Sequence, residues 1–135
     1  MTRIEDKIKQ VEEYLNELEE IIPLSLEEYL GSLEKRLACE RALEKIIESV
    51  NDLAILVIKE KRLKLPNEES KAFSILAEKK FISEDLCEKL RQAIGMRNFL
   101  VHQYEKIDDE LVFETLSAQI IKDITEFLDI LRDLK

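Results

Sequence analysis

The N-terminal stretch of the chain carries apolar side chains at the spacing of an α-helix. Successive apolar positions lie 4, 3, 4, 3 and 4 residues apart, which keeps them on one helical face: Ile4, Ile8, Val11, Leu15, Leu18 and Ile22. This pattern predicts a first helix from about residue 3 to residue 21. Pro23 ends it, because proline lacks the backbone N–H that a continuing helix needs.

A second helical pattern begins after Ser25, which precedes Glu28 by three residues as in a capping box. It predicts one long helix from Leu26 to about Arg62. Gly31 permits a bend, and a break near 37–40 is a further expectation, because so long a helix is uncommon in a globular domain. Its apolar stripe comprises Leu30, Leu33, Leu37, Leu43, Ile47, Val50, Ala54, Val57 and Ile58.

Three more helices follow the linker at 65–67. Asn67 is the expected N-cap of a short helix from Glu68 to about Lys79, and Ser83 caps a fourth helix. The last helix begins after Asp108 and continues to the C-terminus. Its apolar positions are Val112, Leu116, Ile120, Ile121, Ile124, Phe127, Leu128 and Leu131. The chain, residues 1–135, is therefore predicted to form a single all-α domain, an up-down antiparallel bundle of about five helices.

Composition supports a helical bundle and limits the cellular location and the bound groups that we expect. Gly and Pro occur twice each and aromatic residues make up 6%, whereas β-rich domains need more of both. No apolar run approaches the roughly 18–20 residues that span a membrane, and the first residues lack the apolar core of a signal peptide. Cys39 and Cys87 match no metal-binding spacing. We therefore expect a cytoplasmic protein that binds neither a metal ion nor a cofactor.

The formal net charge of −9, from 21 basic and 30 acidic residues, argues against general nucleic-acid binding. It allows a local basic groove, because the field in a cleft depends on where the charges lie. It also suits a partner with a basic surface. Each of the candidates for such a groove is individually better explained as a charge on an exposed helix face. They are Lys59, Lys61, Arg62, Lys79, Lys80 and Arg91.

Arg97 interrupts the apolar face of the fourth predicted helix. The preceding positions of that face are Leu86, Leu90, Ala93 and Ile94. An arginine within an apolar seam is costly unless it is paired or faces a water-filled cleft. The ordinary interpretation is an arginine that extends its head to solvent or pairs with a carboxylate. The alternative is a functional site.

The single histidine, His102, lies five residues after Arg97, and Tyr104 follows two residues later. On a continuous helix, positions 97 and 102 are about 140° apart. Both side chains reach one phosphate only if the helix ends between them or a second subunit contributes. A lone histidine is ordinarily a surface or core residue, but histidine also exchanges protons near neutral pH, and arginine stabilises developing phosphoryl charge. Cleavage of RNA through its 2′-hydroxyl needs both a base and an acid, which a homodimer would supply from two copies of His102.

The stretch Arg97-Asn98-Phe99-Leu100-Val101-His102-Gln103-Tyr104 resembles the R-x4-H-x-Y motif of HEPN-domain toxins of the HepT type. The resemblance extends over nearly the whole chain. Asn51-Asp52-Leu53-Ala54 is similar to the acid-bearing stretch of the family's long second helix, with Glu48 one turn earlier. The 64–66 and 70–73 stretches resemble the family's linker and third helix, and Ile107-Asp108 resembles the entry to its last helix.

The resemblance implies a homodimeric helical bundle that acts as a metal-independent endoribonuclease toxin. It also implies a partner, a minimal nucleotidyltransferase antitoxin that inactivates the toxin by adenylylating the motif tyrosine, here Tyr104. Bulk and negative charge at that position would obstruct RNA. His102 is then the general base or acid, Arg97 the electrostatic stabiliser and Asn98 a positioning group.

Other interpretations remain open at this point. Asp52 and Glu48 either orient Arg97 or His102, or are solvated residues on a polar helix face. The chain as a whole is alternatively a non-catalytic helical partner, or substrate-presenting subunit, of a nucleotidyltransferase, which its acidic charge favours. A ligand-binding bundle with a degraded site is a third hypothesis. An RNase assay distinguishes the ribonuclease toxin from the non-catalytic partner and from the ligand-binding bundle.

Overall fold

The computed structural model describes residues 3–68, 71–102 and 108–134, and for residues 99–102 it describes the backbone alone. All elements of the described part are helical: α1 (Arg3–Ile21), α2 (Leu26–Leu30), α3 (Leu33–Glu60), α4 (Ala72–Glu78), α5 (Glu84–His102), α6 (Asp109–Glu114), the π-helical turn η3 (Thr115–Gln119) and α7 (Ile120–Asp133). Because α6, η3 and α7 follow one another without a break, they form one continuous helical rod. The prediction of an all-α fold is confirmed.

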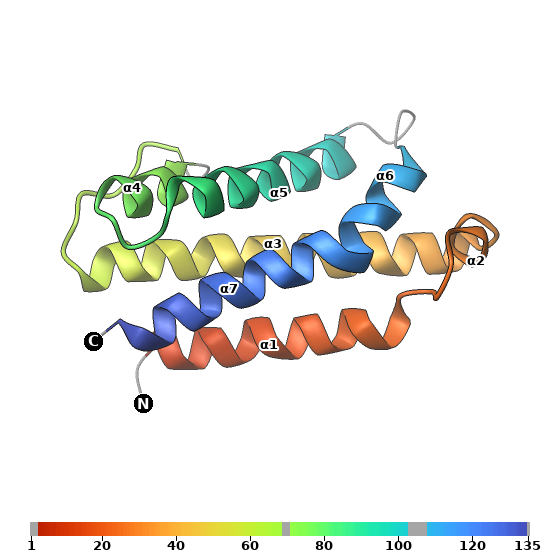
Figure 1. Ribbon diagram of the computed structural model, residues 1–135, viewed down its shortest axis with the longest axis horizontal. Coiled ribbons are helices and arrows are strands. Elements are labelled where there is room, and N and C mark those ends of the chain that lie inside the picture. The colour runs from red at the N-terminus through yellow and green to blue at the C-terminus, as the bar shows by residue number, and fades with distance from the viewer. Residues whose placement is uncertain (1–2, 69–70, 103–107, 135) are drawn as a thin grey trace.

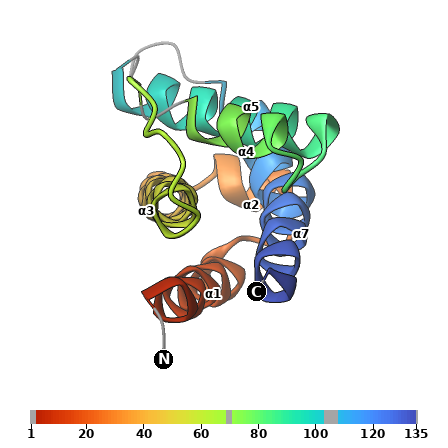
Figure 2. The same ribbon diagram turned by 90° about the vertical axis from the view of Figure 1, so that its left-hand side faces the viewer.

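The long helices alternate in direction along one axis. Figure 1 shows α1, α3, α5 and α7 running back and forth, with the short α2 and α6 at one end and α4 at the other. Seen along the bundle, α3 and α7 lie between α1 on one side and α4 with α5 on the other (Figure 2). The predicted up-down antiparallel arrangement is therefore confirmed.

The core joins the apolar faces of all the long helices. In α1 the predicted stripe points inward, with Val11 and Leu18 fully buried. The later part of the stripe predicted for the second helix is buried in α3. The stripe of the last helix is buried along α6, η3 and α7, except that Ile121 is only partly buried. Phe73 of α4 packs edge-on against Phe127 of α7 with ring centroids 5.6 Å apart. Periodicity thus located most of the core.

The predicted long second helix is divided at Gly31 and Ser32. Ser25 caps α2 as expected, because its hydroxyl accepts a hydrogen bond from the backbone N–H of Glu28 at 3.1 Å. Ser32 then caps α3 by accepting from Lys35 N at 3.2 Å. The break is therefore at the glycine, and the expectation of a break near 37–40 is wrong. The sequence carries the signal for this break, since Ser32 directly follows Gly31 and serine is a favoured N-cap.

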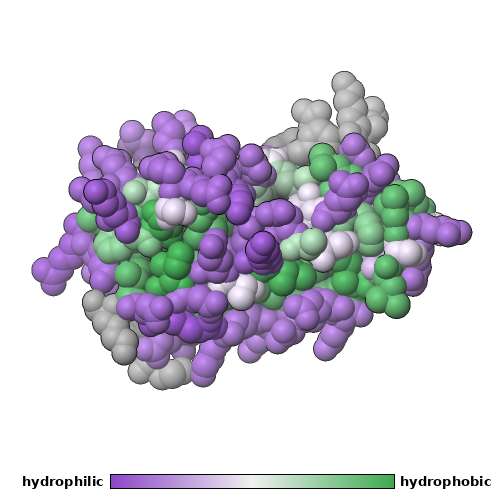
Figure 3. All heavy atoms as spheres, viewed as in Figure 1, coloured by the Kyte–Doolittle hydropathy of each residue, from purple (hydrophilic) through white to green (hydrophobic). Residues whose placement is uncertain are grey.

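The early part of the predicted stripe does not face the core. Tyr29 of α2 and Cys39 of α3 are fully buried in place of the leucines. Three leucines of α2 and α3 and one of α6 are about half exposed: Leu30 (45%), Leu33 (62%), Leu37 (55%) and Leu111 (50%). They lie at the end of the bundle where α2 contacts α6, and Figure 3 shows hydrophobic surface gathered there.

The later helix boundaries partly follow prediction. Ser83 Oγ accepts a hydrogen bond from Leu86 N at 3.0 Å, so the predicted N-cap of α5 is confirmed. The last helix begins after Asp108 as predicted, and Asp108 caps it, because its Oδ1 accepts from Leu111 N at 3.1 Å. The short helix α4 begins at Ala72 with Lys71 at its N-cap, and the prediction of Asn67 as its cap is wrong. In the described ranges, no helix is both long and apolar enough to cross a membrane.

Candidate active site

Arg97 reaches out of the α5 seam toward α3. Leu86, Leu90 and Ala93 hold the same face of α5 against the core, so the arginine stem continues a packed surface. One terminal nitrogen, Nη1, donates a hydrogen bond to Asn98 Oδ1 at 3.2 Å. The Nε atom is buried and has no hydrogen-bond partner in the described part of the chain. No described carboxylate pairs with Arg97 at ion-pair distance, so the structure lacks the core ion pair of the ordinary interpretation.

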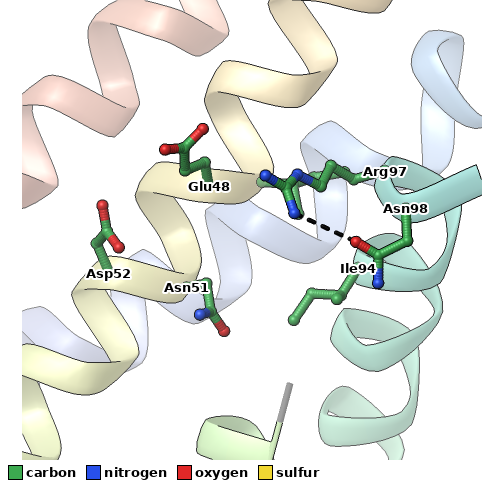
Figure 4. Close-up of a pocket in the computed structure, with 7 residues that line it drawn as sticks. Glu48, Asn51, Asp52, Ile94, Arg97 and Asn98 are labelled. Atoms are coloured by element: carbon green, nitrogen blue, oxygen red, sulfur yellow. Dashed lines mark hydrogen bonds between the residues drawn. The ribbon is translucent and has the colours of Figure 1, made fainter. Parts of the chain in front are cut away.

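A cavity of about 300 Å³ lies between α3 and α5 beside this arginine (Figure 4). Helix α3 provides one wall and α5 the other, because the two helices pack directly against each other. The lining residues are Ile47, Glu48, Asn51 and Asp52 of α3, and Ile94, Arg97 and Asn98 of α5. Four of the six predicted site residues, Arg97, Asn98, Asp52 and Glu48, therefore line one space.

The two carboxylates of that wall are not ligands of the arginine. Asp52 is half exposed and forms an ion pair with Lys7 of α1, with Nζ 3.6 Å from Oδ2. Glu48 is exposed and forms no ion pair within the described residues. Both acids line the cavity, but neither orients Arg97 by a direct contact. Their supporting role stays a prediction.

Asn51 is a polar residue of this site that sequence reasoning did not single out. It is 7% exposed, and its Oδ1 is buried without a hydrogen-bond partner among the described residues. A signal was available, because Asn51 occupies a core position of α3, at helical spacing from the buried Ile47, Ala54 and Ile58. An amide at such a position is as unusual as the arginine in the α5 seam.

The course of α5 decides between the two ways of bringing Arg97 and His102 together. Because α5 is helical through His102, the helix does not end between them, and that expectation is wrong. The two positions are about 140° apart around the helix axis. The other route, a contribution from a second subunit, stays a prediction. The His102 side chain and the whole of Tyr104 lie outside the described residues, so their roles stay predictions.

Most of the basic residues considered for an RNA groove lie away from this cavity. Lys59 lies in the last turn of α3, and Lys61 and Arg62 follow that helix. Lys79 and Lys80 follow α4, and both helix ends are at the opposite end of the bundle from the end of α5 (Figure 1). Arg91 is the exception. It lines a neighbouring cavity of about 270 Å³ together with Gly95 and Asn98, and its Nη1 lies 4.0 Å from Glu88 Oε2.

The two thiols take no part in the site. Cys39 and Cys87 are buried, and burial raises the pKa of each thiol above its usual value, which disfavours the reactive thiolate. Buried in the core, they behave as small apolar residues. The described residues include no cluster of three or more side chains suited to hold a metal ion.

A family model described as "Ribonuclease HepT-like" matches residues 11–131, almost the whole chain. The "tRNA nuclease HepT" of Aphanizomenon flos-aquae is 29% identical over 114 residues, which cover 84% of this chain and 78% of that protein. The "mRNA nuclease HepT" of Shewanella oneidensis is 24% identical over 90 residues, 67% of each chain.

Solved structures share the whole architecture. A tri-AMPylated HEPN toxin of Shewanella oneidensis, solved in complex with its MNT antitoxin, superposes with a TM-score of 0.91 over 99% of this chain and 100% of that one, at 19% identity. The Bacillus subtilis protein YutE, described as a cytosolic protein of unknown function, superposes with a TM-score of 0.78 over 96% of this chain and 86% of that one, at 22% identity. At these identities the likeness concerns the fold.

Proposed function

This chain belongs to the HepT-like ribonuclease family, and from that premise we propose that it is an endoribonuclease toxin of a toxin–antitoxin pair. It cleaves RNA in the cytoplasm by attack of the 2′-hydroxyl, without a metal ion, and its partner is a minimal nucleotidyltransferase antitoxin. The observation that carries the proposal is the partly buried Arg97, which faces a cavity, has no carboxylate partner among the described residues and occupies the arginine position of the motif. The names of the relatives support the same class of activity.

In this proposal each motif residue has a separate task. The Arg97 guanidinium stabilises charge that builds on the phosphorus-bound oxygens, and Asn98 holds the guanidinium through its hydrogen bond to Nη1. His102 removes the proton from the 2′-hydroxyl or donates one to the leaving 5′-oxygen. Tyr104 contacts the substrate and is the residue that the antitoxin adenylylates, which blocks RNA by bulk and charge.

A homodimer supplies the parts that one protomer lacks. The chain has one histidine, and helical phase separates it from Arg97, whereas two copies related by a two-fold axis offer a base and an acid. The half-exposed leucines at the end where α2 contacts α6 suit the contact between copies, because α5 also ends there with His102.

The test is cleavage of a defined RNA by the purified chain in the presence of EDTA. His102→Ala is expected to abolish cleavage and leave the dimer intact, and Arg97→Ala to reduce it by about 100-fold or more. Addition of the nucleotidyltransferase with ATP is expected to inactivate the wild type but not a Tyr104→Phe variant. Undiminished cleavage by His102→Ala would falsify the proposal, and a non-catalytic subunit would leave the RNA intact in every arm.

A further inference from the structure

Asn51 and Arg97 line the cavity between α3 and α5, and each has a buried polar atom without a hydrogen-bond partner among the described residues. Asn51 Oδ1 on the α3 wall is an acceptor, and Arg97 Nε on the α5 wall is a donor. A buried polar atom that forms no hydrogen bond costs free energy, so folded proteins rarely keep one unless a ligand or water completes it. Two such atoms with complementary character in one cavity point to a ligand edge that offers a donor beside an acceptor.

The charges of the lining residues narrow the chemistry of that ligand. Glu48 and Asp52 line the same wall as Asn51, and carboxylates only accept hydrogen bonds. A phosphate, which also only accepts and is negative, is repelled by this wall and is left to the Arg97 side of the cavity. A neutral group that donates hydrogen bonds fits the α3 wall.

The size of the cavity fits one nucleobase. Its volume of about 300 Å³ lies at the small end of ligand pockets, which suits a single nucleobase. Cytosine and adenine each place an exocyclic amino donor next to a ring-nitrogen acceptor, as the Asn51 and Arg97 atoms require. Uracil carries carbonyl acceptors on both sides of its one donor, so a carbonyl oxygen would face the acceptors of α3.

We propose that this cavity is a nucleobase pocket in which Asn51 Oδ1 accepts a hydrogen bond from the exocyclic amino group of cytosine or adenine beside the cleaved phosphodiester. Asn51 is then a specificity-determining residue, and Arg97 contacts the ring acceptor through Nε while its terminal nitrogens serve the phosphate. This inference rests on the proposed RNA-cleaving function and deepens it, because it names the class of base at the cleavage site.

The direct test measures binding without cleavage. Fluorescently labelled oligocytidine and oligouridine, both made with 2′-fluoro sugars that lack the 2′-hydroxyl nucleophile, are titrated with the wild-type chain and followed by fluorescence anisotropy. The two pyrimidines differ in the amino or carbonyl group at ring position 4. We expect oligocytidine to bind about tenfold more tightly than oligouridine.

Two substitutions at position 51 isolate the contact. Asn51→Leu keeps the number of side-chain heavy atoms but removes the acceptor, and is expected to bind both oligomers equally by losing affinity for oligocytidine. Asn51→Asp keeps an acceptor oxygen and is expected to keep the preference. Equal binding of the two oligomers by the wild type, or no binding of either, overturns the inference. A preference that persists in Asn51→Leu overturns it as well.

Cleavage assays separate failure of this inference from failure of the proposed function. With unmodified RNA, Asn51→Leu is expected to cleave with less discrimination between bases, whereas His102→Ala is expected to be inactive. If Asn51→Leu cleaves with the base preference of the wild type, the pocket assignment is wrong and the ribonuclease proposal stands. If the wild type leaves RNA intact, the ribonuclease proposal falls, and the binding titrations still decide whether the cavity takes an amino-bearing base.

Discussion

Asn51 Oδ1 and Arg97 Nε lie buried on facing walls of one cavity, and neither has a hydrogen-bond partner within the described residues. The two side chains come from α3 and α5, far apart in the sequence, and each interrupts an otherwise apolar helix face. An arrangement that lowers stability at two adjacent points is typical of a site kept for binding rather than for folding.

The first prediction follows from the free-energy cost of burying the Asn51 amide oxygen without a hydrogen bond. Asn51→Leu is expected to raise the free energy of unfolding by roughly 1 kcal/mol, because it removes a buried acceptor that forms no bond and adds apolar contact. Urea denaturation measures the change. The contrasting variant is Asp123→Leu, since buried Asp123 accepts hydrogen bonds from Gln119 Nε2 at 3.2 and 3.1 Å and should lose stability. A clear loss of stability in Asn51→Leu would mean that the amide supports the fold.

Gly95 is a second residue that lowers stability, because glycine has a low helix propensity and no close contact among the described residues requires a glycine there. It lies inside α5, and a Cβ placed on it has no atom of the described residues within 4 Å beyond its own helix backbone and chain neighbours. Gly95→Ala is therefore expected to stabilise the chain by about 1 kcal/mol, from helix propensity alone. Gly31→Ala is the matched control, because its added Cβ lies 3.2 Å from Glu27 O and should bring no such gain. Thermal denaturation measures the change in stability of each variant. Equal changes in the two variants would contradict the claim that a methyl group is accommodated at Gly95 but not at Gly31.

Sequence periodicity predicted the bundle and most of its core, because apolar spacing records which helix faces are buried. It failed at Gly31, where two serine caps compete for one stretch and the capped break changes which residues point inward. For the site, motif residues could be identified from their order along the chain. Asn51 could not, because its importance depends on facing Arg97 from another helix, and an amide among apolar residues reveals nothing of its partner until the helices are packed.

The third prediction concerns Glu40, a half-buried acid of α3. Burial, and then the nearby Asp109 and Glu44 carboxylates, raise the pKa of Glu40 above its ordinary value of 4.5, against the opposing effect of Arg36. Below that ordinary value the Glu40 carboxyl is protonated in both the folded and the unfolded chain. Folding then buries no charge at Glu40, and the pKa shift does not lower the stability of the fold. As pH rises through the higher folded pKa, the folded state loses stability relative to the unfolded state, and the loss is complete above it.

Glu40→Gln is therefore expected to stabilise the chain near neutral pH by roughly 0.5 kcal/mol, and to have no effect below the ordinary carboxyl pKa. Chemical denaturation at a series of pH values measures the difference. Glu13→Gln provides the control, because Glu13 is exposed in the middle of α1 and forms no ion pair among the described residues. A gain of the same size at every pH would show that charge is not its cause.

The fourth prediction tests the proposed contact between copies. Leu33 and Leu37 lie one turn apart on α3 and are 62% and 55% exposed. Replacing both with glutamate places charges in an apolar contact, so the variant is expected to be monomeric by analytical ultracentrifugation and inactive on RNA. Leu65→Glu is the control, because Leu65 is 47% exposed and lies beside α4 rather than beside α2 and α6, and this variant is expected to remain dimeric. A double variant that still forms dimers would place the interface elsewhere.

The last prediction asks whether two copies share one catalytic cleft. If one His102 acts as base and the other as acid, a dimer with a single intact histidine is inactive, and a His102→Ala subunit inactivates its wild-type partner. After subunit exchange with a threefold excess of His102→Ala, about a quarter of the wild-type subunits remain in wild-type dimers, and activity per wild-type subunit should fall to that fraction. The control adds the Leu33→Glu and Leu37→Glu changes to His102→Ala, which should prevent pairing and leave the wild-type activity unchanged. Undiminished activity with the dimer-competent variant would show that each protomer completes its own site, which the continuous helix from Arg97 to His102 argues against.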